Sequence, residues 1–229
     1  MAHEIDLREG DLAAHVDQAA AWIASGFIIV APLENGYAYL VDAFFHDGVR
    51  AMHVLRGDDL GVAAQVLIAG EEVLAGIARD VPPAARLLMK AFWPGPLSLN
   101  LLPHRGLSWD LGDNKDLDLV SVRVPNTEFL LGVLRKSGPL AMASAAKAGQ
   151  PPVLDKELIS IRGSDVEGVF HTGELTAIPG SSVVAANEAE IRVIRIGAIT
   201  LSELRDVAPQ ILSEMDEVGR NSEVERGGQ

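Results

Sequence analysis

Two side chains that could do chemistry lie in apolar surroundings. Arg123 lies inside the apolar run 119–125, where a guanidinium needs a partner or a ligand. Ser98 follows a Pro-Gly-Pro turn at 94–96 and lies near the start of the apolar run 97–102. A hydroxyl at a strand start is where α/β proteins often hold ligands. The plainer alternatives are an arginine that pairs with a carboxylate at a sheet edge, and a rigid turn from helix to strand.

The composition excludes several classes of site. The 229 residues include no cysteine, so disulfides and thiolate metal sites are excluded. The formal net charge of −13 argues against broad electrostatic binding of nucleic acid, but not against a local basic pocket. Neither G-x-G-x-x-G nor a P-loop pattern occurs at a strand-to-helix junction. The histidines do not have the spacing of a metal site, so no metal ligand is predicted; they are His3, His15, His46, His53, His104 and His171.

The amino-terminal residues are charged and lack the apolar core of a signal peptide. The longest apolar stretch, 19–33, is interrupted by Ser25 and Gly26 and is too short to span a bilayer. We therefore expect a cytoplasmic protein without a membrane span.

Apolar periodicity, caps and breakers predict helices and strands that are mixed without strict alternation. Helices are expected at 12–23, 47–54, 71–78, 82–92, 127–137 and 201–207, with a helical turn at 155–161. Strands are expected at 27–31, 37–43, 65–69, 97–102, 119–125, 140–143, 166–171, 181–186 and 191–196, with a turn at 32–36. This pattern predicts an α/β protein with a mixed sheet and helices packed on it, rather than a doubly wound Rossmann fold.

The domain organisation is expected to be simple. Residues 1–212 are predicted to form one domain. Residues 213–229 are charged, poor in large apolar residues and end in Gly-Gly-Gln, which predicts a disordered acidic tail.

Five segments, in order, resemble the YrdC family of threonylcarbamoyl-AMP synthases over about residues 12–207. Segment 93–98, WPGPLS, is similar to the family's W-P-G-P-L-T, and segment 119–125 resembles the strand that ends in V-R-V-P. Segment 139–149, PLAMASAAKAG, resembles P-L-A-A-T-S-A-N-x-S-G. Segment 179–184 resembles the family's S-T-V segment, and 193–199 resembles I-x-R-x-G-A-I. The order and spacing together carry the resemblance.

The resemblance implies an open, twisted mixed sheet with a concave ligand pocket. It also implies a reaction in which threonine, bicarbonate and ATP give threonylcarbamoyl-AMP and pyrophosphate, with Mg²⁺ accompanying the ATP. That adenylate would feed the modification of adenosine 37 in tRNA, together with tRNA-modification partners. Such chemistry needs cations around phosphates and polar groups that fix the amino acid.

The resemblance also assigns roles to single residues. The catalytic residues would be Arg56 and Arg123. The residues that would contact ATP are Arg56, Ser98, Ser144 and Arg195. The residues that would hold threonine are Asn35, Arg123, Ser181 and Ser182. The ordinary alternatives are a solvated strand arginine for Arg195 and a loop hydroxyl for Ser144.

The chain departs from the family pattern at two motifs near its start. The signature P-T-D-T-V-Y-G-L is replaced at 32–39 by PLENGYAY, in which only Pro32 and Tyr37 are identities. Glu34 keeps an acid and Asn35 a polar group, but both threonine hydroxyls are lost. The K-x-R motif is replaced by RGD at 56–58, where an arginine can still neutralise phosphate and an aspartate would repel ATP.

A third departure lies in the S-A-N motif. The family's asparagine is Ala146 and the serine after it is Ala148, so two polar contacts are lost. Lys147 between them could supply a substitute charge.

Three hypotheses stay open. The chain is an active synthase with an altered pocket, or a binding module that holds nucleotide, RNA or a protein partner without adenylation, or a carbamoyl-transfer protein with another substrate. The double-stranded RNA binding attributed to the family needs a positive concave face, and the acidic charge counts against it.

Overall fold

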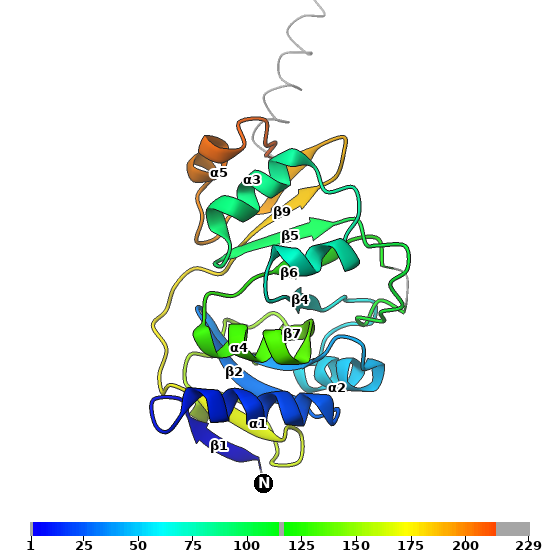
Figure 1. The fold of residues 1–229 in the computed structure, drawn as a ribbon. Helices are drawn as coiled ribbons and strands as arrows, with labels where there is room; N and C mark the ends of the chain where they lie inside the picture. The colour runs from blue at the N-terminus through cyan, green and yellow to red at the C-terminus, as the bar shows by residue number, and fades with distance from the viewer. Residues whose placement is uncertain (1, 115–116, 214–229) are drawn as a thin grey trace, which may run out of the picture.

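The computed structural model describes residues 2–114 and 117–213, and their strands form one mixed sheet (Figure 1). The strand order is β1-β8-β2-β3-β7-β4-β6-β5-β9-β10. The strands are β1 (His3–Asp6), β2 (Ile29–Leu33), β3 (Gly36–Asp42), β4 (Gln65–Leu67), β5 (Leu97–Leu101), β6 (Val120–Arg123), β7 (Leu140–Ser144), β8 (Gly168–His171), β9 (Ser182–Ala186) and β10 (Ile191–Arg195). The sheet contains parallel pairs, such as β4–β6 and β5–β9, and antiparallel pairs, such as β5–β6.

Helices pack on this sheet, so the predicted α/β class with a mixed sheet is confirmed. The α-helices are α1 (Leu12–Ala24), α2 (His46–Arg56), α3 (Pro83–Phe92), α4 (Glu128–Ser137) and α5 (Leu201–Val207). The 3₁₀ helices are η1 (Glu71–Gly76) and η2 (Lys156–Leu158).

Local signals fix several helix ends. The Asp11 carboxylate accepts hydrogen bonds from two N–H groups of the first turn of α1, and Thr200 forms a capping box with Glu203 at the start of α5. Gly57 ends α2 in the left-handed region, at a φ of 74°. Pro83 opens α3, where its missing N–H breaks no helical hydrogen bond.

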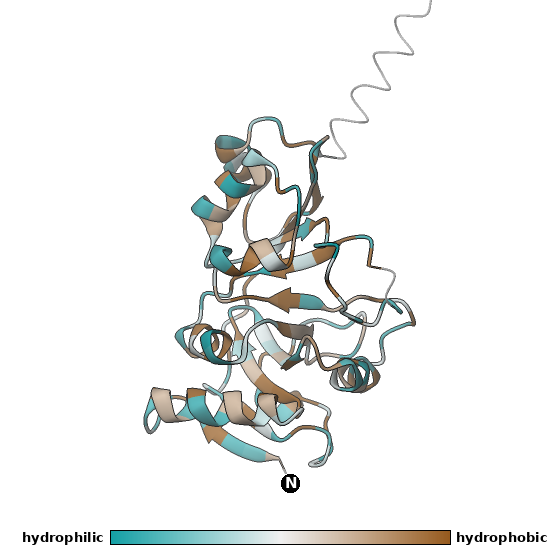
Figure 2. Ribbon diagram, turned by 45° about the vertical axis from the view of Figure 1, so that its right-hand side comes forward, coloured by the Kyte–Doolittle hydropathy of each residue, from teal (hydrophilic) through white to brown (hydrophobic). Residues whose placement is uncertain are grey.

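The two faces of the sheet pack against different helices, because successive side chains on a strand point to opposite faces. Ile29, Leu40 and Leu140 lie on one face, in a cluster with residues of α1 and α4. Val41 and Val66 lie on the other face, in a cluster with residues of α2, α3 and α5. Figure 2 shows the strands in the middle of the sheet as largely hydrophobic, whereas hydrophobic and hydrophilic residues alternate along the helices.

The turn predicted at 32–36 is wrong in its first half, because Pro32 and Leu33 belong to β2. Strand β2 pairs with β8 only at Ile29 and Val30, and beyond them it has β3 alone as a neighbour. Because Pro32 lies in this part of the strand, its missing N–H costs no hydrogen bond on the unpaired side.

Two further predictions need correction. The helix predicted at 71–78 is the short 3₁₀ helix η1, which begins after Gly70 without a side-chain cap. Strand β1 was not predicted, because its sequence HEID is mostly polar and its order comes from pairing with β8. The sequence offers Asn126 or Thr127 as the N-cap of α4; the structure has Thr127 there, and its side chain makes no capping hydrogen bond.

The predicted limits of the domain stay a prediction. Leu212 forms a bridge to Arg192 on β10, and Ser213, which we assigned to the tail, is buried. The rest of the predicted tail, 214–229, lies outside the described residues. No helix among the described residues is both long enough and apolar enough to cross a membrane.

We expect Leu40→Ala to lower the free energy of unfolding by about 2–5 kcal/mol, because Leu40 is fully buried in the cluster with α1 and α4. The matched control is Leu87→Ala on α3, where the side chain is 52% exposed. This control should change the free energy of unfolding by less than about 0.5 kcal/mol. Urea unfolding followed by circular dichroism measures both, and equal losses would contradict the assigned core.

Candidate functional site

A cavity of about 710 Å³ lies over the polar part of the sheet face that α1 and α4 cover elsewhere. Its floor includes Gln65 on β4, Ser121 on β6 and Asn100 on β5. By register, Gln65 lies opposite Met142 and Asn100 lies opposite Ser121, so these side chains share the face of Leu40 and Leu140. The volume falls in the range of pockets that hold small ligands.

The structure brings most of the predicted site residues together. Those that line the cavity are Asn35, Arg56, Arg123, Ser144, Ser181 and Arg195. Ser98 and Ser182 do not line the cavity, and both are 0% exposed. The ligand assigned to each residue stays a prediction.

Arg123 is held by an ion pair. Its side chain is 3% exposed, and Nη2 donates to Glu34 Oε2 at 2.6 Å while Nε donates to the Gly95 carbonyl at 3.0 Å. The other Glu34 oxygen accepts from the Asn126 N–H at 2.6 Å. Burial lowers the pKa of Arg123, and Glu34 opposes that shift. The pairing with a carboxylate was one of our alternatives, but β6 lies inside the sheet and not at its edge.

Asp58 does not lie free in the cavity. One oxygen is 2.8 Å from Arg56 Nε, the other is 2.7 Å from His53 Nδ1, and the side chain is 6% exposed. His53 Nε2 lies 2.8 Å from the Leu111 carbonyl oxygen. The repulsion of ATP that we expected from Asp58 is therefore reduced by the neighbouring Arg56 guanidinium.

Arg195 binds the chain segment that precedes β9. Its Nη2 donates to the Ser181 carbonyl oxygen at 2.8 Å and to Ser181 Oγ at 3.2 Å, and its Nε donates to the same carbonyl at 3.2 Å. Among the described residues no carboxylate lies within ion-pair distance of Arg195, in contrast to Arg56 and Arg123. Arg195 is therefore the cavity arginine whose charge is least compensated by the described chain.

Ser182, the first residue of β9, forms buried hydrogen bonds to the segment that follows β10. Its Oγ donates to the Ile199 carbonyl at 2.6 Å and accepts from the N–H groups of Gly197 and Ile199 at 2.8 and 3.1 Å. A Cβ at Gly197 would lie 2.1 Å from the Gly180 carbonyl oxygen, so only glycine fits. This packing fixes the backbone that carries Ser181 and Arg195.

The loop after β7 docks onto the end of α2. Ser144 Oγ accepts from the Ala146 N–H at 3.3 Å, and the Ala148 N–H donates to the Arg56 carbonyl at 3.0 Å. Lys147 does not line the cavity, because its amine donates to the Leu55 carbonyl at 2.7 Å. The charge of Lys147, which we considered as a substitute for the lost polar contacts, therefore lies at the C-terminal end of α2.

Sequence reasoning missed three polar residues of the cavity floor: Gln65, Asn100 and Ser121. Each interrupts or borders an apolar strand, and that is the signal that could have found them. The Asn100 Oδ1 atom is buried without a hydrogen-bond partner among the described residues.

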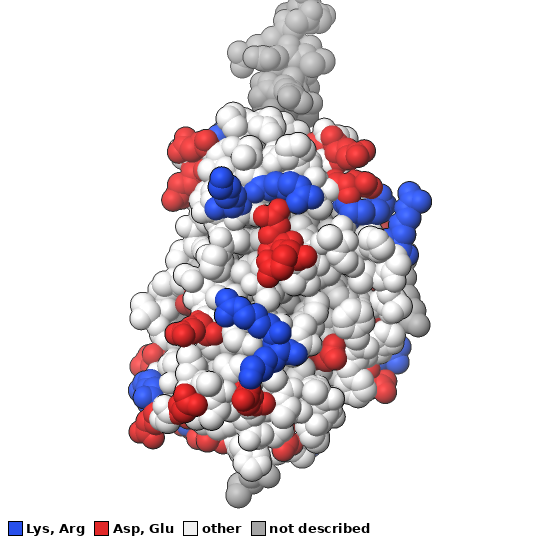
Figure 3. All heavy atoms as spheres, in the orientation of Figure 1, with Lys and Arg blue, Asp and Glu red and all other residues white. Residues whose placement is uncertain are grey.

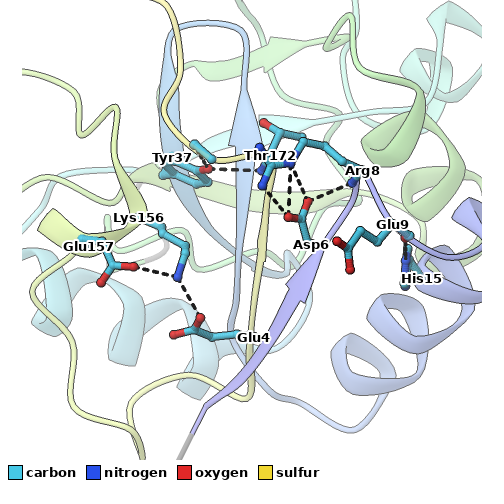
Figure 4. Close-up of polar contacts among 10 residues, drawn as sticks. Glu4, Asp6, Arg8, Glu9, His15, Tyr37, Lys156, Glu157 and Thr172 are labelled. Atoms are coloured by element: carbon cyan, nitrogen blue, oxygen red, sulfur yellow. Dashed lines mark hydrogen bonds and ion pairs between the residues drawn. The ribbon is translucent and has the colours of Figure 1, made fainter.

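Tyr37 lines the cavity, but its hydroxyl is used elsewhere (Figure 4). The hydroxyl donates to the Gly173 carbonyl at 2.5 Å and accepts from the Thr172 N–H at 3.3 Å. Burial raises the pKa of Tyr37. Figure 4 shows the neighbouring contacts that attach the first strand, in which Lys156 bridges Glu4 and Glu157.

The described residues contain no group of three His, Asp or Glu side chains that could hold a metal ion. Asp58, which lines the cavity, is paired with Arg56, and Glu34, which does not line it, is paired with Arg123. A divalent cation therefore has no ligand set from the described chain.

The sequence and the fold match known proteins. Residues 21–197 match a family model of Sua5, YciO and YrdC proteins described as telomere recombination. A Mycobacterium tuberculosis protein provisionally named threonylcarbamoyl-AMP synthase is 32% identical over 190 residues, which cover 82% of this chain and 87% of the relative.

Solved structures of other proteins have a similar fold. Pyrococcus abyssi Sua5 complexed with L-threonine has a TM-score of 0.82 at 25% identity and covers 93% of this chain. This chain spans 62% of that Sua5 chain. Escherichia coli YciO has a TM-score of 0.75 at 19% identity, covers 89% of this chain and 98% of its own, and shows likeness of fold alone.

We expect Glu34→Ala to lower the free energy of unfolding by about 3–5 kcal/mol, because it leaves the buried Arg123 guanidinium without its partner. The double variant Glu34→Ala/Arg123→Met removes both charges and should recover most of that loss. Urea denaturation of the single and double variants measures the coupling. Equal stability of the two would show that the pair is not coupled.

A pH effect is expected from Asp110, whose loop carries the Leu111 carbonyl. Burial raises the pKa of Asp110, but the Gly112 N–H and the Arg50 guanidinium outweigh burial and hold that pKa below its ordinary value. The stabilisation is full above the unfolded-state pKa of about 3.9 and is lost as the pH falls through the lower folded-state pKa.

Asp110→Asn should therefore cost most free energy of unfolding near neutral pH, and the difference from the unchanged protein should shrink below about pH 4. Denaturation curves between neutral and acidic pH measure it. A difference that stays constant with pH would contradict the pairing of Asp110 with Arg50.

Proposed function

From the premise that this chain belongs to the Sua5, YciO and YrdC family, we propose that it is a threonylcarbamoyl-AMP synthase. The observation that carries the proposal is the convergence of Arg56, Ser144, Ser181 and Arg195 on one cavity from segments far apart in the sequence. The L-threonine in the related Pyrococcus abyssi Sua5 supports an amino-acid ligand at this site.

The proposed reaction has two steps. The amine of threonine condenses with bicarbonate to an N-carboxylate, with loss of water. An oxygen of this carboxylate then bonds to the α-phosphorus of ATP while the bond to the bridging oxygen of the β-phosphate breaks, so pyrophosphate leaves. In this proposal the adenylate feeds the modification of adenosine 37 in tRNA, and the protein acts in the cytoplasm with tRNA-modification partners.

The arginines take different parts in this proposal. Arg195 has no carboxylate partner among the described residues, so it is the readiest contact for a phosphate. Arg56 is paired with Asp58 at a distance of 2.8 Å from Nε, which has no hydrogen-bond partner among the described residues, and in this proposal its outer guanidinium nitrogens contact phosphate oxygens. A ligand anion reaches Arg123 only in competition with Glu34, so Arg123 serves orientation more than charge stabilisation.

Magnesium is assigned to the triphosphate of ATP and not to the chain, since the described residues offer it no ligand set. Bound there, it would neutralise phosphate charge and help pyrophosphate to leave. The residues of this cavity would hold the nucleotide and the amino acid around it.

One observation favours a second function, in which the cavity binds a ligand without adenylation. Arg56 and Arg123 already carry carboxylate partners, which reduces the positive charge available for a transition state. An RNA ligand is disfavoured by the net charge of −13. On the face in Figure 3, acidic and basic side chains occur in separate groups and form no continuous basic surface.

The test is pyrophosphate release from ATP by the purified protein with magnesium, threonine and bicarbonate, omitting each in turn. We expect release that needs threonine and bicarbonate, and a fall in kcat/KM of at least about 10²-fold in Arg56→Ala and in Ser144→Ala. The matched control is Arg86→Ala on α3, whose side chain is 55% exposed and outside the cavity. It should leave the rate unchanged.

Two results would contradict the proposed synthase activity. Absence of release, with calorimetry still detecting ATP, would favour the binding module. Absence of both would mean that this cavity serves no nucleotide.

A further inference from the structure

A continuous chain of hydrogen bonds runs across neighbouring strands beneath the cavity. It begins at Gln65 on β4, passes through Ser98 on β5 and Ser181 just before β9, and ends at Arg195 on β10. Strands β4, β6, β5, β9 and β10 are consecutive in the sheet. Ser121 on β6 joins the chain as a branch from Gln65.

When the donors and acceptors of this hydrogen-bond chain are matched, one hydroxyl proton remains unassigned. Gln65 Nε2 donates to Ser98 Oγ at 2.8 Å and to Ser121 Oγ at 3.1 Å, so both amide protons are used. Ser98 is 0% exposed and already accepts from Gln65, so its own proton goes to Ser181 Oγ at 2.9 Å. Ser181 Oγ accepts from Ser98 and also from Arg195 Nη2 at 3.2 Å, which fills both of its lone pairs.

What remains on Ser181 is its own O–H, and Ser181 lines the cavity. The hydroxyl can only donate, since its acceptor capacity is used. It lies beside Arg195, which is also a donor. Two donors side by side, with no carboxylate partner among the described residues, suit an anionic oxygen and not an ammonium group.

We propose that Gln65 is a positioning residue: through Ser98 it sets the direction of the hydrogen-bond chain, so that Ser181 donates its hydroxyl to a carboxylate or phosphate oxygen of the ligand. The identity of that ligand as threonine or ATP rests on the proposed function. Gln65 acts at a distance and does not itself need to touch the ligand. Because Ser98 and Ser181 are buried, a reversed or broken link between them cannot be repaired cheaply by water.

The substitution that separates this role from simple packing is Gln65→Glu. A carboxylate of the same shape accepts where the amide donates, so Ser98 turns its proton toward residue 65. Ser181 then has to donate to Ser98 and loses its free O–H. Gln65→Met removes the link without reversing it, and its effect on the ligand should be smaller.

Calorimetry with L-threonine and with ATP tests the proposal. Ser181→Ala identifies which of the two probes contacts the hydroxyl. Gln65→Glu should weaken the same probe about tenfold or more and leave the other within about twofold, while Gln65→Met gives an intermediate loss. In the Ser181→Ala background, Gln65→Glu should have no further effect. The control for added charge is Gln18→Glu on the exposed side of α1, which should bind both probes normally.

A merely structural role gives a different result. In that case both probes weaken together, Met and Glu at position 65 act alike, and the losses at Gln65 and Ser181 add. Any of these outcomes would overturn the proposal. So would normal binding of both probes by Ser181→Ala.

A second measurement does not depend on activity. Neutron diffraction from crystals of the deuterated protein should place the deuteron of Ser98 toward Ser181 and the deuteron of Ser181 toward the cavity. A Ser181 deuteron on the line to Ser98 would overturn the inference even in an active enzyme. If the protein binds neither threonine nor ATP, the proposed function fails, and the deuteron positions alone decide the direction of the chain.

Discussion

A charge buried inside the sheet is the constraint on which the site depends. Arg123 lies on β6, between β4 and β5, where an uncompensated guanidinium would strongly disfavour the fold. Glu34 compensates it from the turn between β2 and β3, and also holds the backbone before α4 through the Asn126 N–H. The Glu34 carboxylate therefore connects three segments next to the cavity: the turn that carries it, the central strand β6 and the residue that precedes α4. Asn35, next to Glu34 in that turn, is positioned by the same tie.

Much of the fold could be predicted because its signals are local. Apolar runs gave the central strands, and Asp11, Gly57 and Thr200 gave helix ends through contacts within a few residues. The features that were missed depend on distant partners. Strand β1 has little apolar sequence and is ordered by β8, more than 160 residues away, as His3 pairs with Gly168. Pro32 reads as a turn residue until one knows that β2 has only one neighbour there.

The candidate site also combines features that the local sequence predicts with features that depend on distant partners. The family motifs predicted a set of site residues, and the structure brings six of them, five serines and arginines and Asn35, to one cavity. The partners of these residues could not be read from the sequence, because Glu34 and Arg123 are 89 residues apart. Asp58 illustrates the point: in the sequence it replaces a cation, and in the structure its carboxylate pairs with Arg56 and lies 2.7 Å from His53 Nδ1. The altered motifs change the electrostatics of the pocket without leaving a carboxylate exposed in it.

The contact between Gly197 and the Gly180 carbonyl has a consequence for how this chain can change over evolutionary time. The cavity side chains at 34–35 and 56–58 differ from the family pattern. The backbone crossing at Gly197 offers no such latitude, because a methyl group there would meet an oxygen at 2.1 Å. Because Gly180 precedes β9 and Gly197 follows β10, a side chain at position 197 would displace the backbone at both strand ends, whereas substitutions on the cavity floor do not meet this constraint.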